Sequence, residues 1–109
     1  MFNLFKSVSK NDVYENPGSG EFLAKANTYP QSVLLDVRTP GEHESGNIPG
    51  SINIDIFSPT FEKQVALLDR NKTYFVYCHS GQRSGQACLI MQGFGFGNLF
   101  NLAEGVMAL

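Results

Sequence analysis

The chain has 109 residues, of which 42% are hydrophobic and 17% charged, and this composition predicts a globular single domain spanning residues 1–109 rather than a disordered chain. Its formal net charge is −2, and its eight lysines and arginines form no basic stripe, which argues against nucleic acid as a partner. It has no apolar run long enough for a signal peptide or a membrane-spanning helix, so we expect a cytoplasmic protein without a membrane partner.

The first half of the chain has the pattern of two strands with helical turns around them. After a Pro-Gly loop, residues 21–27 are expected to form a helix. Residues 32–37 (SVLLDV) are a nearly continuous apolar run, typical of a strand that is covered on both faces, and a Thr-Pro-Gly turn ends it. Residues 41–46 favour a short helical turn, and residues 51–54 (SINI) predict a second strand.

The next segment favours a helix over residues 60–70. Ser58 and Pro59 form a start signal, an N-cap hydroxyl followed by proline. Phe61, Val65 and Leu68 recur at the spacing of one helical face. A buried helix face of this kind would pack against a sheet.

Residues 73–78 (TYFVYC) are the most hydrophobic segment of the chain and predict a third strand. A helix is expected at residues 84–94, with Gly95 as its stop signal. Residues 98–102 predict a fourth strand, and residues 103–109 a final turn or short helix. Strands that alternate with helices at this spacing predict a three-layer α/β fold with a mostly parallel sheet. The apolar side chains on one side of the 84–94 helix are Ala87, Ile90, Met91 and Phe94.

Cys78 falls at the carboxyl end of a strand, where parallel α/β sheets bind their ligands. In the loop that follows, Gly81 permits a positive φ, so the backbone N–H groups can point inward and stabilise an anion together with the helix dipole. A sulfur placed there favours the nucleophilic thiolate, and Arg83 would hold an anionic substrate. The alternative is a buried Cys78 without chemistry and a solvated Arg83.

Three blocks of the sequence resemble the signature blocks of single-domain rhodanese-like sulfurtransferases, in the same order. They are residues 34–54 (LLDVRTPGEHESGNIPGSINI), 76–84 (VYCHSGQRS) and 95–105 (GFGNLFNLAEG), and the resemblance spans residues 32–105. It implies a three-layer α/β domain with a central sheet of about five strands and helices on both faces. It also implies that Cys78 takes the sulfane sulfur of a donor such as thiosulfate as a persulfide and passes it to cyanide or a thiol.

The resemblance implies roles for the other block residues, with Cys78 as the catalytic nucleophile. Asp36, Arg38 and Glu42 would support the site, with Glu42 as the partner of Arg38. The expected partners are a small sulfur-containing anion as substrate and a thiol or a protein persulfide as acceptor, with no metal or organic cofactor. The substrate would be bound by the loop residues His79, Ser80, Gly81, Gln82, Arg83 and Ser84.

Two other functions stay open. Cysteine phosphatases use a similar loop, but five residues separate their cysteine and arginine, whereas four separate Cys78 from Arg83, which favours sulfur over phosphate. The other alternative keeps the fold and the persulfide without turnover, as a sulfur relay or a regulatory binding module. An intact Cys78 and Arg83 do not distinguish an enzyme from a carrier.

The remaining candidates are the second cysteine and the two histidines. Cys88 is expected to be a small apolar residue of the helix, and the alternative is a resolving thiol that attacks the Cys78 persulfide. Two cysteines without metal-ligand spacing predict free thiols and no zinc site. We expect His43 on the surface, and His79 exposed or in contact with substrate rather than acting as a base.

The chain departs from the family pattern at two places outside the cysteine loop. Asn47 stands where many relatives have histidine, and residues 103–109 (AEGVMAL) replace a Gly-Gly pair followed by tryptophan. These departures concern the walls of the pocket and its specificity. Phe57, Phe61, Val106 and Met107 are candidates for those walls, although core packing is expected for most of them.

Overall fold

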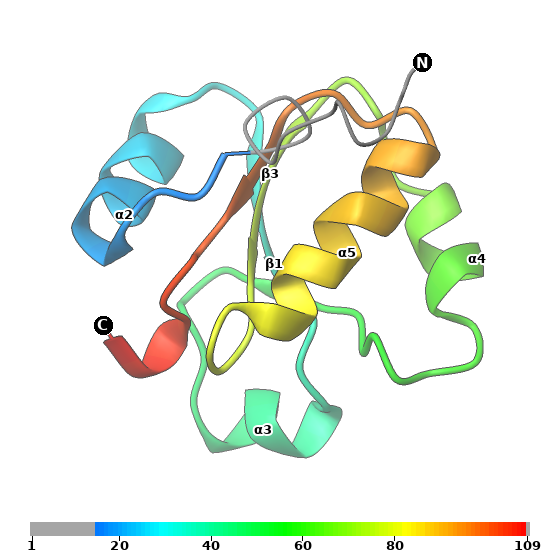
Figure 1. The fold of residues 1–109 in the computed structure, drawn as a ribbon, viewed down its shortest axis with the longest axis horizontal. Coiled ribbons are helices and arrows are strands. Elements are labelled where there is room, and N and C mark those ends of the chain that lie inside the picture. Colours follow the sequence, from blue (N-terminus) through cyan, green and yellow to red (C-terminus); the bar gives the residue numbers. More distant parts are fainter. Residues whose placement is uncertain (1–14, 109) are drawn as a thin grey trace.

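The computed structural model describes residues 15–108. Its strands form one sheet in the order β2-β1-β3-β4, and every pair of neighbours is parallel. The α/β class and the parallel sheet were predicted correctly; the described residues form four strands, and Glu15 adds an isolated parallel bridge to Phe100 at the outer edge of β4. The elements follow one another as α2 (Ser19–Thr28), β1 (Ser32–Asp36), α3 (Pro40–Ser45), β2 (Ile52–Asn53), α4 (Phe61–Ala66), β3 (Thr73–Tyr77), α5 (Gln82–Gly93), β4 (Leu99–Asn101) and the 3-10 helix η1 (Val106–Ala108) (Figure 1).

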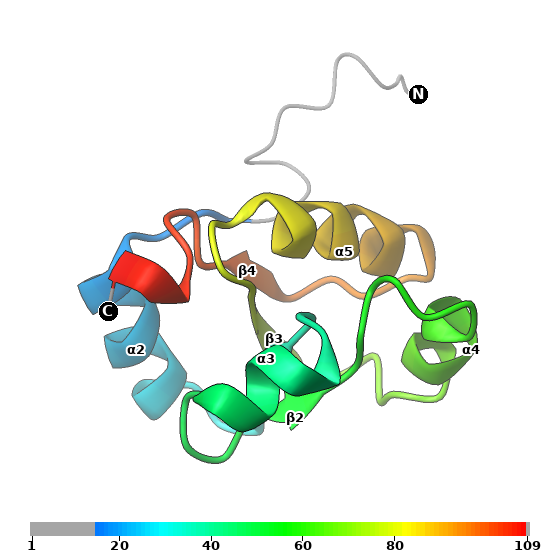
Figure 2. The ribbon, with the colours of Figure 1, turned by 90° about the horizontal axis from the view of Figure 1, so that it is seen from below.

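Helices cover both faces of the sheet. In Figure 2, α4 and α5 lie on one side of the strands, and α2 and η1 lie on the other. The side chains of β3 alternate between the two cores: Tyr74 and Val76 pack with α4 and α5, whereas Phe75 and Tyr77 pack with α2. The burial of both faces explains why the sequence of β3 is a nearly unbroken apolar run. Among residues 15–108, no helix is long and apolar enough to cross a membrane.

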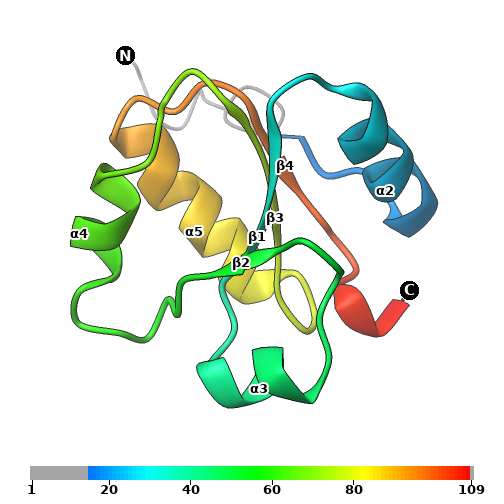
Figure 3. The same cartoon turned by 180° about the vertical axis from the view of Figure 1, so that it is seen from behind.

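The carboxyl ends of the strands carry the loops that matter for chemistry. Figure 3 shows α3, the loop between β3 and α5, and η1 gathered at one end of the sheet. The backbone joins two of these segments directly, because the N–H of Val106 donates to the carbonyl of Cys78 at 2.8 Å. The topology therefore brings three separate stretches of sequence to Cys78.

The helix predicted at residues 60–70 is shorter than expected. Its N-cap is Thr60 rather than Ser58, and the Ser58 hydroxyl instead accepts the Thr60 N–H at 3.2 Å within the preceding turn. The helix ends at Ala66, because the N–H groups of Leu67 and Leu68 bond to carbonyls three residues back, in the tighter 3-10 geometry. The predicted apolar face is confirmed, since it packs into the core.

The helix after the cysteine begins two residues before its predicted start, at Gln82, because Gly81 with φ 94° supplies its N-cap. Its stop was predicted correctly: the helix ends at Gly93, and Gly95 follows with φ 95°. The early start brings the first turn of α5, with Ser84, directly against the cysteine.

Candidate active site

Cys78 follows the last residue of β3 and is fully buried. Its Sγ accepts three hydrogen bonds from the loop and the first turn of α5: the Gly81 N–H at 3.1 Å, the Ser84 N–H at 3.3 Å and the Ser84 hydroxyl at 3.4 Å. Burial alone would raise the pKa of the Cys78 thiol. The Ser84 hydroxyl and the N–H groups of Ser84, Ser80 and Gly81 outweigh it and lower the pKa below its ordinary value. The site therefore favours a thiolate.

The loop keeps this shape because two glycines allow close backbone contacts. Gly81 has φ 94°, and a Cβ there would overlap the carbonyl of Ala103. Gly105 has φ 79°, and a Cβ there would overlap the carbonyl of His79. The segment after β4 thus packs directly against the backbone of the cysteine loop, and only glycine fits at both contact points.

The other loop residues predicted to bind substrate are arranged around this centre. Ser84 is buried beside Sγ, whereas the side chains of His79, Ser80 and Gln82 are exposed at the surface of the loop. Backbone and side-chain donors thus converge on the sulfur, while the exposed side chains remain accessible from solvent. This is the arrangement expected of a loop that receives a small anion.

Arg83 is held by α3. Its Nη1 and Nη2 donate to the two carboxylate oxygens of Glu42 at 2.8 and 3.0 Å, and the centre of its guanidinium lies 5.6 Å from the centroid of the Phe57 ring. The hydrogen bonds from Arg83 lower the pKa of Glu42 to about 2. The predicted pairing of Glu42 with Arg38 is therefore wrong, since Glu42 bridges α3 to the cysteine loop instead.

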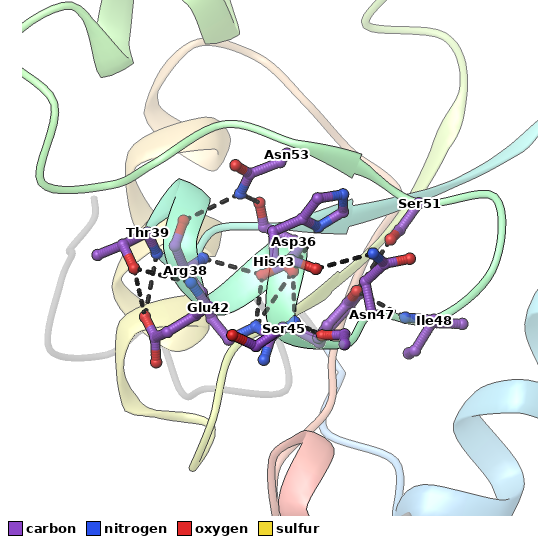
Figure 4. Close-up of polar contacts among 12 residues, drawn as sticks. Asp36, Arg38, Thr39, Glu42, His43, Ser45, Asn47, Ile48, Ser51 and Asn53 are labelled. Carbon is purple, nitrogen blue, oxygen red and sulfur yellow. Dashed lines mark hydrogen bonds and ion pairs between the residues drawn. The ribbon is translucent and has the colours of Figure 1, made fainter.

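Asp36 is fully buried at the end of β1 and is the true partner of Arg38 (Figure 4). Arg38 donates from Nε to Oδ1 at 3.0 Å and from Nη2 to Oδ2 at 2.8 Å, and Nδ1 of His43 lies 2.8 Å from Oδ2. Burial would raise the pKa of Asp36, but the hydrogen bonds from Arg38 and His43 hold it below its usual value. The predicted surface position of His43 is wrong, because its half-buried ring faces Asp36.

Two further contacts hold this network and were missed in the sequence. Thr39 and Glu42 form a capping box at the start of α3, in which the Thr39 N–H donates to Glu42 Oε1 at 3.0 Å. The Thr-x-x-Glu spacing is the known signal for this motif and was present in the sequence. The side-chain amide of Asn53 donates to the carbonyls of Asp36 and Arg38, both at 2.9 Å. No local sequence pattern predicts these two hydrogen bonds.

The candidates for the pocket walls separate into two groups. Phe61 is buried in the core on the α4 and α5 side of the sheet, and Val106 packs against the separate core on the α2 side, so both have the packing role expected for most of them. Phe57 and Met107 are 69% and 67% exposed. The Phe57 ring lies against Arg83, and the backbone N–H of Met107 donates to the His79 carbonyl, so both residues lie beside the cysteine loop.

Cys88 is buried in α5, and burial raises the pKa of its thiol above the ordinary value, so it is a neutral core residue as expected. Both Cys78 and Cys88 are free thiols. Within the part of the chain that the structure describes, no three His, Cys, Asp or Glu side chains gather as a metal site.

The fold and this site define an α/β protein with a thiolate held at the junction of a central parallel strand and the next helix. The chain belongs to the rhodanese-like domain family, whose family model matches residues 19–109. It is 32% identical over 76 residues to a sulfurtransferase of Allochromatium vinosum, covering 70% of this chain and 69% of that protein.

Two further proteins show how far the similarity extends. The chain is 38% identical over 104 residues to the thiosulfate:glutathione sulfurtransferase of Saccharomyces cerevisiae, covering 85% of this chain and 73% of that protein. The crystal structure of a rhodanese-related protein from Thermoplasma volcanium superposes with a TM-score of 0.72 at 27% identity, covering 87% of this chain and 89% of that one. The similarity thus includes both the sequence blocks and the fold.

Proposed function

We propose that this chain is a sulfurtransferase that moves a sulfane sulfur from a donor such as thiosulfate to a thiophilic acceptor, cyanide or a thiol, through a persulfide on Cys78. The observation that carries the proposal is the convergence of three hydrogen-bond donors on the buried Cys78 Sγ. The relatives named as sulfurtransferases support the same class of reaction.

In the first step, the Cys78 thiolate attacks the outer sulfur of thiosulfate. A new S–S bond forms at Cys78, the S–S bond of thiosulfate breaks, and sulfite leaves with its electron pair. The product is an enzyme persulfide whose terminal sulfur carries the negative charge. The N–H groups of Gly81 and Ser84, which bond to Sγ of the free cysteine, would then share the charge of the persulfide.

In the second step, the acceptor attacks the terminal sulfur of the persulfide. With cyanide as the acceptor the product is thiocyanate, and with a thiolate it is a new persulfide. In both cases the electron pair of the broken S–S bond returns to Cys78, which becomes a thiolate again. Both steps are nucleophilic displacements at sulfur. The cycle is therefore balanced without any further oxidant or reductant.

Arg83 is the proposed anion-binding residue. Its guanidinium has five N–H donors, and Glu42 takes one from each of Nη1 and Nη2. The remaining donors can hold the sulfonate of thiosulfate and then the departing sulfite. Glu42 fixes the plane of the guanidinium, and the exposed loop side chains of His79, Ser80 and Gln82 would contact the substrate.

Mass spectrometry of the intact protein tests the chemistry directly. After treatment with thiosulfate, we expect a gain of about 32 Da, one sulfur atom, that persists in Cys88→Ser and disappears in Cys78→Ser. If no sulfane donor produces this gain, the persulfide mechanism is wrong. Hydrolysis of an aryl phosphate that is lost in Cys78→Ser would instead establish the phosphatase alternative.

The relay alternative is separated by kinetics, because it shares the persulfide. Slow turnover with thiosulfate together with fast, saturable sulfur transfer from a protein persulfide would identify a carrier. Fast turnover with thiosulfate and a small thiol or cyanide would identify an enzyme. The cytoplasmic location stays a prediction from the sequence.

A further inference from the structure

Asn101 ends β4 behind the cysteine loop and is only 4% exposed. Its side-chain Nδ2 donates to Asn16 Oδ1 at 2.9 Å and to the carbonyl of Gly81 at 3.3 Å. Its Oδ1 is buried and has no hydrogen-bond partner among the described residues. A buried carbonyl without a partner costs free energy, and an apolar side chain of the same shape would avoid that cost. The role of Asn101 must therefore lie in its two donors.

The direction of the Asn101 amide is set by its neighbours. Turning the amide over would place Oδ1 against the Gly81 carbonyl and Asn16 Oδ1, which are both acceptors. The observed direction gives a donor to each of them and leaves Oδ1 unpaired. The Gly81 carbonyl therefore has a hydrogen-bond donor from Asn101, whereas the side-chain carbonyl of Asn101 has none among the described residues.

Gly81 is the residue at which the loop reverses. Its N–H points inward to Cys78 Sγ at 3.1 Å, whereas its carbonyl points outward and accepts from the Gly85 N–H and the Asn101 amide. With φ 94° and no side chain, Gly81 depends on its backbone contacts to fix this orientation. Part of the outer side of the loop borders a cavity of about 690 Å³, lined in part by Gly81 and Asn101.

We propose that Asn101 is a positioning residue of the cysteine loop, which holds the Gly81 carbonyl on the outer side so that the Gly81 and Ser84 N–H groups converge on the sulfur. This inference rests on the proposed role of Cys78 as the nucleophile. Asn101 does not touch the reacting sulfur and acts only through the orientation of the loop backbone.

Asn101→Leu tests the proposal, because leucine keeps the branched shape while removing both donors and the unpaired acceptor. We expect the thermal midpoint to stay equal to that of the wild type or to rise. The midpoint of the pH dependence of Cys78 alkylation should rise by about half a pH unit, because a donor to the thiolate loses alignment. The rate of sulfur loading from thiosulfate at neutral pH should fall about threefold, in line with the smaller thiolate fraction.

Two more variants keep the test decisive. Asn16→Leu removes only the other partner of the Asn101 amide and should keep the wild-type alkylation midpoint and loading rate. Asn101→Ser, whose hydroxyl is too short to reach the Gly81 carbonyl, should show the same shift as Asn101→Leu and replaces it if leucine prevents folding. A wild-type midpoint in either folded Asn101 variant, or an equal shift in Asn16→Leu, would overturn the proposal. If the wild type fails to load sulfur, the proposed function fails while the alkylation midpoint still reports on Asn101.

Discussion

The Ser84 hydroxyl offers the most direct test of how the loop activates Cys78. Ser84 is fully buried, and its Oγ lies 3.4 Å from Sγ as a hydrogen-bond donor. Ser84→Ala removes this donor and leaves the backbone N–H at 3.3 Å in place. Because the change deletes one oxygen and keeps the helix, it isolates a single hydrogen bond to the thiolate.

The size of the effect follows from the chemistry of that bond. A hydrogen bond to a charged group contributes about 1.5–3 kcal/mol, and the diffuse charge of sulfur places this one at the lower end. Since one pKa unit corresponds to about 1.4 kcal/mol, the Cys78 pKa in Ser84→Ala should rise by about one unit. The thiolate fraction at neutral pH, and with it the alkylation rate, would fall by up to about tenfold.

The assay is the rate of iodoacetamide modification of Cys78 as a function of pH, followed by peptide mass spectrometry so that Cys88 is counted separately. Ser80→Ala is the matched control, because the exposed Ser80 contributes its backbone N–H rather than its side chain. Ser80→Ala should titrate like the wild type. If Ser84→Ala also does so, the Ser84 hydroxyl does not stabilise the thiolate and the account of the site is wrong.

Three further variants test the support around the loop. The pKa of Glu42 is about 2 in the folded chain against an ordinary 4.5, so its pair with Arg83 stabilises the fold above pH 4.5 and is lost as the pH falls toward 2. We expect this acid-labile contribution to the free energy of unfolding, measured with urea, to be about 1 kcal/mol and to be absent in Glu42→Gln. Asp36→Ala should lower the free energy of unfolding by about 3–5 kcal/mol by leaving a buried arginine unpaired, and a loss below about 1 kcal/mol would contradict that role. Gly105→Ala should reduce sulfur loading and the thermal midpoint, whereas Gly97→Ala, which adds a Cβ in open space, should match the wild type.

The features that the sequence predicted well are local ones. The strand ending at Cys78 follows from an apolar run of β-forming residues, and the turn at Gly81 follows from the residue type that tolerates positive φ. The burial of Cys88 follows from helical periodicity, since that residue falls on the covered side of α5. In each case the signal and the structure lie within a few residues of each other.

The ion pairs could not be predicted in the same way. Glu42 lies four residues from Arg38 and 41 residues from Arg83, and local spacing favours the nearer arginine. In the structure Glu42 pairs with Arg83 instead. Arg38 bonds to the buried Asp36, and the capping box orients the Glu42 carboxylate toward the cysteine loop. The partner of Glu42 depends on how α3 packs on the sheet. This is a feature of the tertiary structure, and local sequence spacing does not predict it.

The departures from the family pattern can now be placed on the structure. Residues 103–109 (AEGVMAL) stand where the family pattern has a Gly-Gly pair, and Gly105 is the one glycine in this segment. Gly105 is the position with φ 79° whose missing side chain makes room for the His79 carbonyl, whereas Glu104 is exposed. This segment thus has a glycine at the position where the cysteine loop requires one, and the side chain of the neighbouring Glu104 reaches solvent. Glu104 therefore adds a negative charge beside the loop without disturbing the Gly105 contact that shapes it, so we expect Glu104→Gln to change the preference among sulfur acceptors while leaving the loading of Cys78 as in the wild type.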